Sequence, residues 1–465
     1  MDYTTTVLIT LVIYKIVLIG IGFYANKKTS STEDYFIGGR GLGPWVAAIS
    51  SAASASSAWT LLGMSGAAYA MGLPAIWLVP AVVSGYIFNW AWLAPRLQKK
   101  AEAEQSVTLT ELLAHGSGQF KKPILWLCSL CIVFAFTFYV AAQFQAAGNT
   151  FATTFGVSME SSIALGTTII LIYTLLGGFW AVSITDTLQG LLMAVAGVIL
   201  PVAGLLAVGG FAELWQQMQM VYSGPQLQLT GEHSGFIALA FIIGLFGIGL
   251  GQPGQPHVVN RMMALRDQKS VAQAKIIAIG WAAIVVGGML IVGWCAKVLI
   301  EPVANNEQAL LEVTNVLFPP VIAGIMIAAI LSAIMSTADS QLLVSASAIS
   351  YDIGDDKNHK NSLLYSRLTV VIMCVISMLI AIYIPKDIFT RVLFAWNALG
   401  AAFGPLLIVK VISKSVEGKY AFAAIFTGFT LSVILSLFPS APGDFLERII
   451  PFVLAFILAW LGRNK

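Results

Sequence analysis

The sequence contains little charge. Only 10% of its 465 residues are Asp, Glu, Lys or Arg, whereas 58% are hydrophobic and the mean hydropathy is +0.85. A soluble domain carries about 25% charged residues. This scarcity excludes a soluble globular protein and indicates an integral membrane protein, for which the number of domains cannot be estimated from chain length.

Cysteine is scarce as well. The four cysteines all lie in apolar runs, and the CxxC formed by Cys128 and Cys131 has neither a second pair nor a nearby His. Buried free cysteines usually behave as small apolar side chains. We therefore predict a packing role for all four and no metal centre.

Long apolar runs, in contrast, are abundant. A membrane-spanning helix needs about 20 mostly apolar residues, and runs of this kind predict thirteen helices. No small-residue cleavage site follows the first run, so we interpret it as a retained span and not as a signal peptide. The predicted spans cover residues 5–25, 43–63, 71–95, 123–148, 160–181, 187–208, 234–255, 274–299, 318–347, 364–384, 389–411, 420–438 and 448–462.

The few basic residues are unevenly distributed among the loops. If the N-terminus lies outside, 20 of the 25 Lys and Arg fall in inner segments, including Lys27, Lys28, Arg261 and Lys357, and four fall in outer segments. Excess Lys and Arg marks the cytoplasmic side. We therefore predict a multi-pass plasma (inner) membrane protein with its N-terminus outside and its C-terminus in the cytoplasm. Lys15 lies within the first span, where it is interpreted as snorkelling or as part of a helix contact.

Two of the predicted spans look interrupted. Residues 47–63 are a run of small and hydroxyl residues, and residues 246–257 contain four glycines and two prolines. Irregular backbone at membrane depth is tolerated beside a cavity. Because these are spans two and seven, they can open two inverted five-helix repeats, as in secondary transporters. The alternative is that the small residues only allow close helix packing.

The predicted fold is thus all-α, with a core of five plus five helices. The first helix, residues 1–30, lies outside this core. The two repeats are residues 31–208 and 209–411, and residues 412–465 form two further helices.

The ninth span carries hydroxyl groups that are unusual in a bilayer. In the segment LSAIMSTADSQLLVSASA, residues 331–348, Ala333, Ser336, Thr337 and Ser340 share one helical face, and Asp339 borders it. A small hard cation prefers several oxygen ligands, and ionisable residues within spans usually have a function. We predict a cation site here. The alternative is that each hydroxyl only bonds the carbonyl four residues earlier.

Two other segments offer oxygens to the same site. The second span can supply backbone carbonyls around Ala53 and Ser56. Asp186, at the start of the sixth span, is either a helix-capping residue or a carboxylate of the ion path.

These segments resemble the sodium/solute symporter family, and most closely its sodium/proline symporters. The order and spacing of the motifs cover nearly the whole chain. The motifs are STEDYFIGGRGLGPWVAAIS at 31–50, WTLLGMSGAAYAMG at 59–72, FTFY at 136–139, GGFWAVSITDTLQG at 177–190, GQPHVVNRMMA at 254–264, IMSTADSQLLVSASA at 334–348 and NALGAAFGP at 397–405.

The resemblance implies a fold of the leucine-transporter type and import of a small solute with Na⁺ by alternating access. It places the main Na⁺ site at the backbone oxygens of Ala53 and Ser56 and at Ala333, Ser336 and Thr337. A second Na⁺ site, present in some members, would use Asp186, Thr337, Asp339 and Ser340.

The resemblance is weaker in the solute pocket. Sodium/proline symporters typically have an aspartate where this chain has Ala55, and they have tryptophan and tyrosine where it has Ile248 and Gln252, whereas Ser57 and Tyr139 are retained. The predicted solute-binding residues are Ser57, Tyr139, Gln143, Ile248 and Gln252. Proline or a related small amino acid is the favoured solute, with its carboxylate met by backbone donors of the broken helices.

Other functions stay open at this point. The same scaffold can carry a monocarboxylate, pantothenate or a sugar, Asp186 and Asp339 can serve proton coupling, and a channel or facilitator would conduct without accumulation. A sensor is disfavoured because the chain shows no soluble output domain. An enzyme is disfavoured because it would need a paired nucleophile and base or a metal cluster. Beyond Na⁺, a solute and the lipid bilayer, the sequence indicates no partner, neither nucleic acid nor protein.

Overall fold

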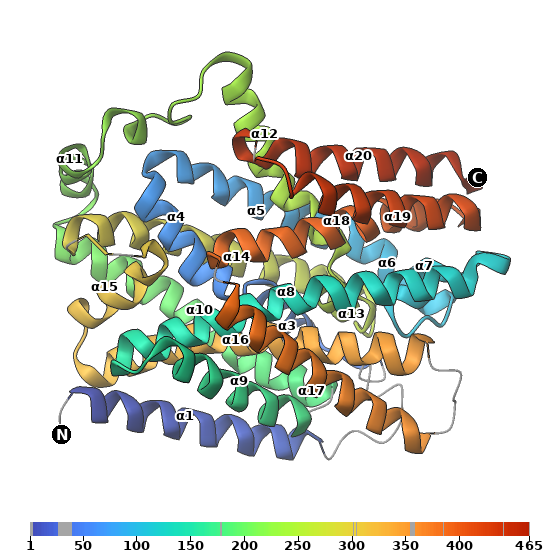
Figure 1. Ribbon diagram of the computed structural model, residues 1–465, viewed down its shortest axis with the longest axis horizontal. Coiled ribbons are helices and arrows are strands. Elements are labelled where there is room, and N and C mark those ends of the chain that lie inside the picture. The colour runs from blue at the N-terminus through green and yellow to red at the C-terminus, as the bar shows by residue number, and fades with distance from the viewer. Residues whose placement is uncertain are drawn as a thin grey trace.

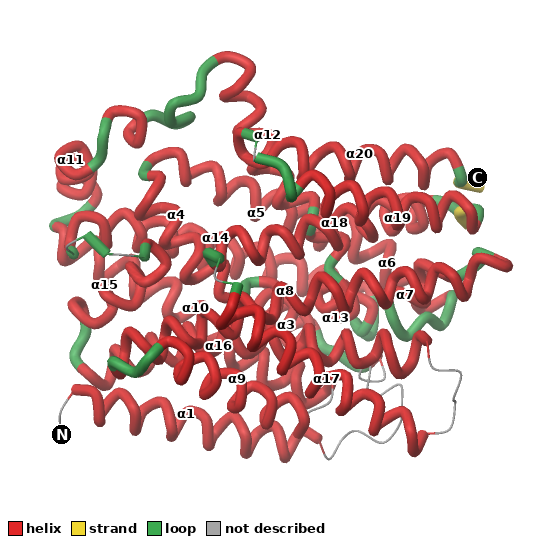
Figure 2. Tube along the Cα trace, viewed as in Figure 1, coloured by secondary structure: helices red, strands yellow, loops and turns green. Residues whose placement is uncertain are grey.

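The computed structural model describes residues 3–26, 40–176, 179–300, 302–303, 305–353, 359–384, 386–439 and 441–464. These residues are almost entirely helical, and the long helices run side by side along the longest axis of the molecule (Figures 1 and 2). Lys27, Lys28, Lys357 and the predicted boundary between residues 30 and 31 lie outside the described residues.

Apart from two short strands, one of them near the C-terminus, the regular elements among the described residues are helices. In chain order the α-helices are α1 (Tyr3–Asn26), α3 (Pro44–Ala55), α4 (Met64–Met71), α5 (Leu78–Ile87), α6 (Ala94–Ala103), α7 (Leu109–Ala114), α8 (Lys121–Phe155), α9 (Met159–Leu176), α10 (Phe179–Val208), α11 (Phe211–Val221), α12 (Gly235–Leu250), α13 (Pro256–Met263), α14 (Gln268–Leu299), α15 (Ala309–Leu317), α16 (Pro320–Ser347), α17 (His359–Tyr383), α18 (Ile388–Ile412), α19 (Gly418–Leu435) and α20 (Phe445–Leu461). The 3₁₀ and π segments are η2 (Trp59–Gly63), η3 (Leu73–Trp77), η4 (Phe88–Leu93), η5 (Gly118–Phe120), η6 (Gly224–Leu227), η7 (Gln252–Gly254), η8 (Asn306–Gln308), η9 (Ala348–Ile353) and η10 (Pro442–Asp444), and strands β1 (Ser415–Val416) and β2 (Arg463–Asn464) are antiparallel.

Ten helices among the described residues are long and apolar enough to cross a membrane, and α9 contains a shorter apolar helix, Met159–Leu175. Every predicted span coincides with at least one helix. The number thirteen stays a prediction, because the second span is divided into short helices and α20 has 17 residues. The chain is a multi-pass membrane protein.

Both predicted interruptions are helix breaks. α3 ends at Ala55, and the chain continues into the π-helical η2 only at Trp59. In the seventh span α12 ends at Leu250, η7 follows, and α13 begins at Pro256. Proline suits the first position of a helix, because the N–H that it lacks would have no partner there. Pro256 therefore marks the start of α13.

Helix pairs at matching positions of the two predicted repeats pack in the same way. In the first half α3 packs on α10 and α8 packs on α9, and in the second half η7 packs on α18 and α16 packs on α17. The two halves meet where α3 contacts α13, α14 and α16. α1 lies along the outside against α16 and α10, and α19 and α20 pack on α18 at the far side (Figure 1).

The start of the sixth span differs from the sequence prediction. α10 begins at Phe179, eight residues before the predicted start at residue 187, so Asp186 lies two turns inside the helix. A helix-capping role for Asp186 is therefore wrong. From the sequence, this segment was divided between the end of the fifth predicted span, at residue 181, and a short loop, whereas the backbone from Phe179 onward is already helical. All four cysteines are buried and free, as expected of packing residues.

Candidate functional site

The hydroxyl groups of α16 meet backbone carbonyls at the end of α3. Ser336 Oγ donates to the oxygen of Ala53 at 3.2 Å and to the oxygen of Ala333 at 3.3 Å. Thr337 Oγ1 donates to the oxygen of Ser54 at 2.9 Å. All of these residues are buried. The last turn of α3 and the middle of α16 thus form one cluster of uncharged oxygens.

This arrangement distinguishes the two predictions made for the hydroxyls of α16. Ser332 and Ser345 donate to carbonyls four residues earlier in the same helix, at 2.7 and 2.8 Å. Ser336 and Thr337 instead reach across to α3. A hydroxyl that donates to a carbonyl can rotate and present its lone pairs to a cation, so the cluster suits a small hard ion that prefers oxygen ligands. Ser56, the fifth predicted ligand residue, follows directly after α3, and its hydroxyl lies 3.4 Å from Tyr86 OH.

Asp186 of α10 and Arg261 of α13 form a buried ion pair. The pair lies beside Ser340, one turn after Ser336 on α16. Arg261 Nη2 is 2.5 Å from Asp186 Oδ2, and the two side chains are 2% and 0% exposed. The same carboxylate oxygen accepts hydrogen bonds from Ser54 Oγ at 2.9 Å and from Ser340 Oγ at 3.1 Å. Asp186 and Ser340, both predicted for the second ion position, are therefore in contact.

Arg261 does not lie in an inner loop, as its counting among the inner basic residues had implied. It lies on α13 in the protein interior, where Nη2 also donates to Ser340 Oγ at 2.8 Å and Nε to Ser50 Oγ at 2.5 Å. Its remaining partner is the backbone oxygen of His257. Buried charges are normally paired, so the presence of Asp186 within a span was the signal that a cation should be sought nearby.

Asp339 is close to this ion pair but does not join it. Its side chain is fully buried on α16, and neither carboxylate oxygen has a hydrogen-bond partner among the described residues.

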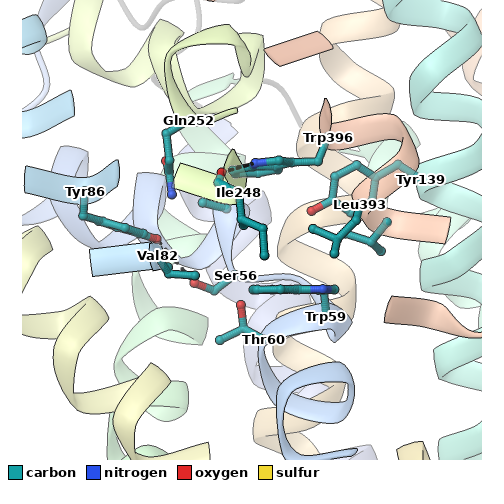
Figure 3. A pocket seen from close by; sticks show the side chains of 12 residues that line it. Ser56, Trp59, Thr60, Val82, Tyr86, Tyr139, Ile248, Gln252, Leu393 and Trp396 are labelled. Carbon is teal, nitrogen blue, oxygen red and sulfur yellow. Dashed lines mark hydrogen bonds between the residues drawn. The ribbon is translucent and has the colours of Figure 1, made fainter. Parts of the chain in front are cut away.

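A small cavity lies beside both helix breaks (Figure 3). The indoles of Trp59 and Trp396 lie on opposite sides of it, and the rings of Tyr86 and Tyr139 lie at its two ends in this view. None of its lining residues is charged. They are Ala55, Ser56, Trp59, Thr60, Val82, Tyr86, Tyr139, Ile248, Gln252, Val392, Leu393 and Trp396.

Three of the five predicted solute-binding residues, Tyr139, Ile248 and Gln252, line this cavity. The other two lie behind its wall and serve the first helix break. Gln143 Oε1 accepts a hydrogen bond from the backbone N–H of Ala58 at 3.0 Å, and Ser57 Oγ accepts one from Tyr139 OH at 3.2 Å. A solute-binding role for Gln143 and Ser57 stays a prediction, since Gln143 Nε2 is buried without a hydrogen-bond partner among the described residues.

Two aromatic residues of the cavity, Tyr86 and Trp396, were not predicted from the sequence. Tyr86 comes from α5 and Trp396 from α18, and neither stands in a motif that distinguishes it from other membrane aromatics. Trp396 Nε1 donates to the oxygen of Ile248 at 2.9 Å (Figure 3), and Gln255 Nε2 donates to the oxygen of Trp396 at 2.9 Å. Trp396 therefore joins α18 to the second helix break while facing the cavity.

Comparison with known proteins identifies the family. The model of the sodium:solute symporter family matches residues 35–428. The chain belongs to that family. It is 34% identical to the osmoregulated proline transporter OpuE of Bacillus subtilis over 97% of this chain and 93% of the relative. It is also 34% identical to the sodium/proline symporter of Escherichia coli, over 94% of this chain and 88% of the relative.

A solved structure of a Na⁺-coupled sialic acid symporter superposes with a TM-score of 0.82 at 20% identity, covering 99% of this chain and 98% of the other. At this identity the likeness shows the fold. The predicted all-α fold of the leucine-transporter type is confirmed, and so is membership of the predicted family. The protein is thus a membrane transporter that uses Na⁺ as its coupling ion.

Proposed function

We propose that the protein imports proline, or a closely related small amino acid, together with Na⁺ by alternating access. One observation carries this proposal. An uncharged cavity lies between two helix breaks, and Ser56 connects the cavity wall to the oxygen cluster of α3 and α16. A solute in the cavity and an ion in the cluster would therefore share the end of α3, so that binding of one orders the site of the other.

The lining of the cavity suits a small zwitterion with an apolar body. Two indoles and the side chains of Ile248 and Leu393 offer apolar surface, and Gln252 and Thr60 offer a few polar atoms. Broken helices expose backbone N–H and C=O groups that can meet a carboxylate and an amine. The relatives named above are proline carriers, which favours proline among the solutes of this class.

The main Na⁺ site would consist of Ala53, Ser56, Ala333, Ser336 and Thr337. A sharp test compares two buried serines of α16. We expect Ser336→Ala to raise the half-saturating Na⁺ concentration by about 10-fold or more, because a hydrogen bond or ligand to a charged group contributes about 1.5–3 kcal/mol. Ser345→Ala is the matched control, since the hydroxyl of Ser345 donates to the backbone oxygen of Gln341 in its own helix. Equal Na⁺ dependence of the two variants would contradict this ion site.

The two halves, residues 31–208 and 209–411, would form the inverted repeats of this carrier. The equivalent packing of α3 on α10 and of η7 on α18 supports this division. The Lys and Arg distribution favours an orientation with the N-terminus outside and the C-terminus in the cytoplasm.

The transport test uses proteoliposomes loaded without Na⁺. We expect labelled proline to accumulate when Na⁺ is present outside, and accumulation to disappear when K⁺ replaces Na⁺. Flux that equilibrates but never accumulates would instead indicate a facilitator and refute coupling.

A second candidate solute class is favoured by one specific observation. Ala55, Ile248 and Gln252 all line the cavity, and these are the positions at which the chain departs from sodium/proline symporters. A panel of amino acids, monocarboxylates, pantothenate and sugars should therefore compete with labelled proline. Na⁺-driven uptake of another member without proline uptake would assign a changed pocket to the same ion-coupled scaffold.

A further inference from the structure

Three rings follow one another from the cavity toward the end of α8 that the basic residues mark as cytoplasmic. Tyr139 of α8 lines the cavity, and its ring centroid lies 6.3 Å from that of His257 on α13. The ring of Phe136, one turn earlier on α8, packs edge-on against His257 at 5.2 Å. Because α13 starts at the second helix break, its separation from α8 would open the cavity toward this end of the molecule.

The next turn of α13 is bonded to the short helix α7. Asn260 follows His257 by one turn, so the two side chains share a face of α13. Asn260 is 6% exposed, and its Oδ1 accepts a hydrogen bond from the backbone N–H of Leu109 at 3.2 Å. Leu109 is the first residue of α7, where a backbone N–H has no partner within its own helix. This bond therefore holds α13 against α7.

Two threonines tie the same end of α7 to the segment that follows α16. Thr108 caps α7 by accepting a hydrogen bond from the N–H of Glu111 at 3.1 Å, and it donates to Asp352 Oδ1 at 2.9 Å. Thr110 donates to the other carboxylate oxygen of Asp352. Asp352 lies in η9, directly after α16. The first turn of α7 thus stands between α13 and η9 and is bonded to both.

The last turn of α7 is fixed to a third element. Lys410 Nζ of α18 donates to the backbone oxygens of Leu112 and His115 at 3.2 and 2.6 Å. A cation is favourable at this end of a helix, where the carbonyls have no partner within the helix. Most of α7 is also buried. The helix is therefore anchored at both ends on elements other than α13, and Asn260 adds the bond to α13.

Resting on the proposed Na⁺ symport, we propose that α7 is a bolt that keeps the cytoplasmic side of the carrier closed and that Asn260 is the residue that engages it. The bond of Asn260 to α7 and the bonds of Thr108 and Thr110 to Asp352 act in series between α13 and η9. Loss of either set frees α13 to move away from α8, and the solute then leaves past His257. Alternating access requires contacts of this kind to form and break in every cycle.

Proline at position 109 removes the bond at its donor. Proline is favoured at the first position of a helix, and Thr108 already has the extended backbone, with φ −121° and ψ 158°, that a residue before proline adopts. Leu109→Ala is the matched control, because it shortens the same side chain and keeps the N–H. Asn260→Leu removes the bond at its acceptor, so the test does not depend on the folding of a single variant.

Distances between two spin labels measure the opening in proteoliposomes without solute. The labels are attached through Gln119→Cys and Lys269→Cys, since both positions are exposed and lie shortly after α7 and α13. One hydrogen bond changes such an equilibrium by about 2- to 10-fold. We expect Leu109→Pro and Asn260→Leu each to increase the ratio of separated to closed molecules by this factor, and Leu109→Ala to leave it unchanged. An unchanged ratio in Asn260→Leu, or an equal increase in Leu109→Ala and Leu109→Pro, would overturn the proposal.

Transport kinetics distinguish a bolt from a binding residue. A population shifted toward the cytoplasmic side has fewer molecules facing outward, so the half-saturating Na⁺ and proline concentrations should rise for uptake and fall for efflux from loaded vesicles. A rise on both sides in Asn260→Leu would place Asn260 in the binding site and overturn the proposal. Absence of Na⁺-driven proline uptake by the unsubstituted protein would refute the proposed function instead, and the spin-label distances, measured without solute, would still test the bolt.

Discussion

The Asp186–Arg261 pair gives the sharpest test of how the core is held together. Each side chain is at least 98% buried, and their nearest atoms are 2.5 Å apart. At an effective dielectric constant of about 20, two opposite charges 4 Å apart attract by about 4 kcal/mol. Removing one partner of a buried pair costs about 3–5 kcal/mol, since the other charge is left without compensation.

We expect Asp186→Asn to lower the free energy of unfolding by about 3 kcal/mol. The lower end of the range applies, because Arg261 keeps Ser50, Ser340 and the backbone oxygen of His257 as neutral partners. Arg261→Met should cost a similar amount, since Asp186 keeps only hydroxyl donors.

The double variant decides the interpretation. Removing both charges leaves no buried ion, so we expect Asp186→Asn/Arg261→Met to be more stable than the sum of the single losses predicts, by about 2 kcal/mol or more. Reversible unfolding in mixed micelles of increasing SDS content measures all four proteins. Strictly additive losses would show that the two charges do not stabilise each other.

Three further predictions concern Glu307, Trp396 and Gly254. Glu307 accepts hydrogen bonds from the backbone N–H groups of Ile388 and Phe389 at 3.0 and 2.8 Å, and burial raises its pKa above 4.5. Because the folded state then binds the proton more tightly than the unfolded state, stability should rise as the pH falls toward 4.5, and Glu307→Gln should remove this dependence in thermal unfolding scans. Trp396→Phe removes the hydrogen bond to the oxygen of Ile248, so we expect a loss of about 0.5–1.5 kcal/mol in stability and a higher half-saturating solute concentration in uptake assays. Gly254→Ala should abolish folded protein on size-exclusion chromatography, since its Cβ would lie within 3.0 Å of the oxygen of Leu399, whereas Gly280→Ala, with open space around it, should be tolerated.

The sequence predicted the parts of the fold that depend on helical periodicity. The hydroxyls of Ser336 and Thr337 share a face with Ala333, and a face of this kind must meet another element that offers polar partners. Gly and Pro in residues 246–257 marked the second helix break for a local reason, since proline removes a backbone donor. Both features are properties of a few neighbouring residues, and for this reason they could be predicted without a structure.

Contacts between distant segments could not be predicted in the same way. Arg261 follows a helix break near the inner side, where the excess of basic residues made a loop position the natural interpretation. Only the approach of α13 to α10 shows that it pairs with Asp186. Likewise no sequence pattern predicted that the amide oxygen of Gln143 on α8 accepts a hydrogen bond from the backbone N–H of Ala58 at the first helix break. Asp186 and Arg261 are 75 residues apart, and Ala58 and Gln143 are 85 residues apart. Contacts over such separations leave no periodic pattern in the sequence.

The positions of these contacts connect the ion site to the opening of the carrier. The last turn of α3 provides the oxygens of Ala53 and Ser54 to α16, and the hydroxyl of Ser54 to Asp186 on α10. If α3 moves away from α16, the oxygen cluster loses two of its members and Asp186 loses one donor in the same step. Because Ser56 follows directly and lines the cavity, the same movement changes the solute wall. If the proposed Na⁺ site is correct, release of Na⁺ and access to the solute would therefore depend on a single helix end, as coupling by alternating access requires.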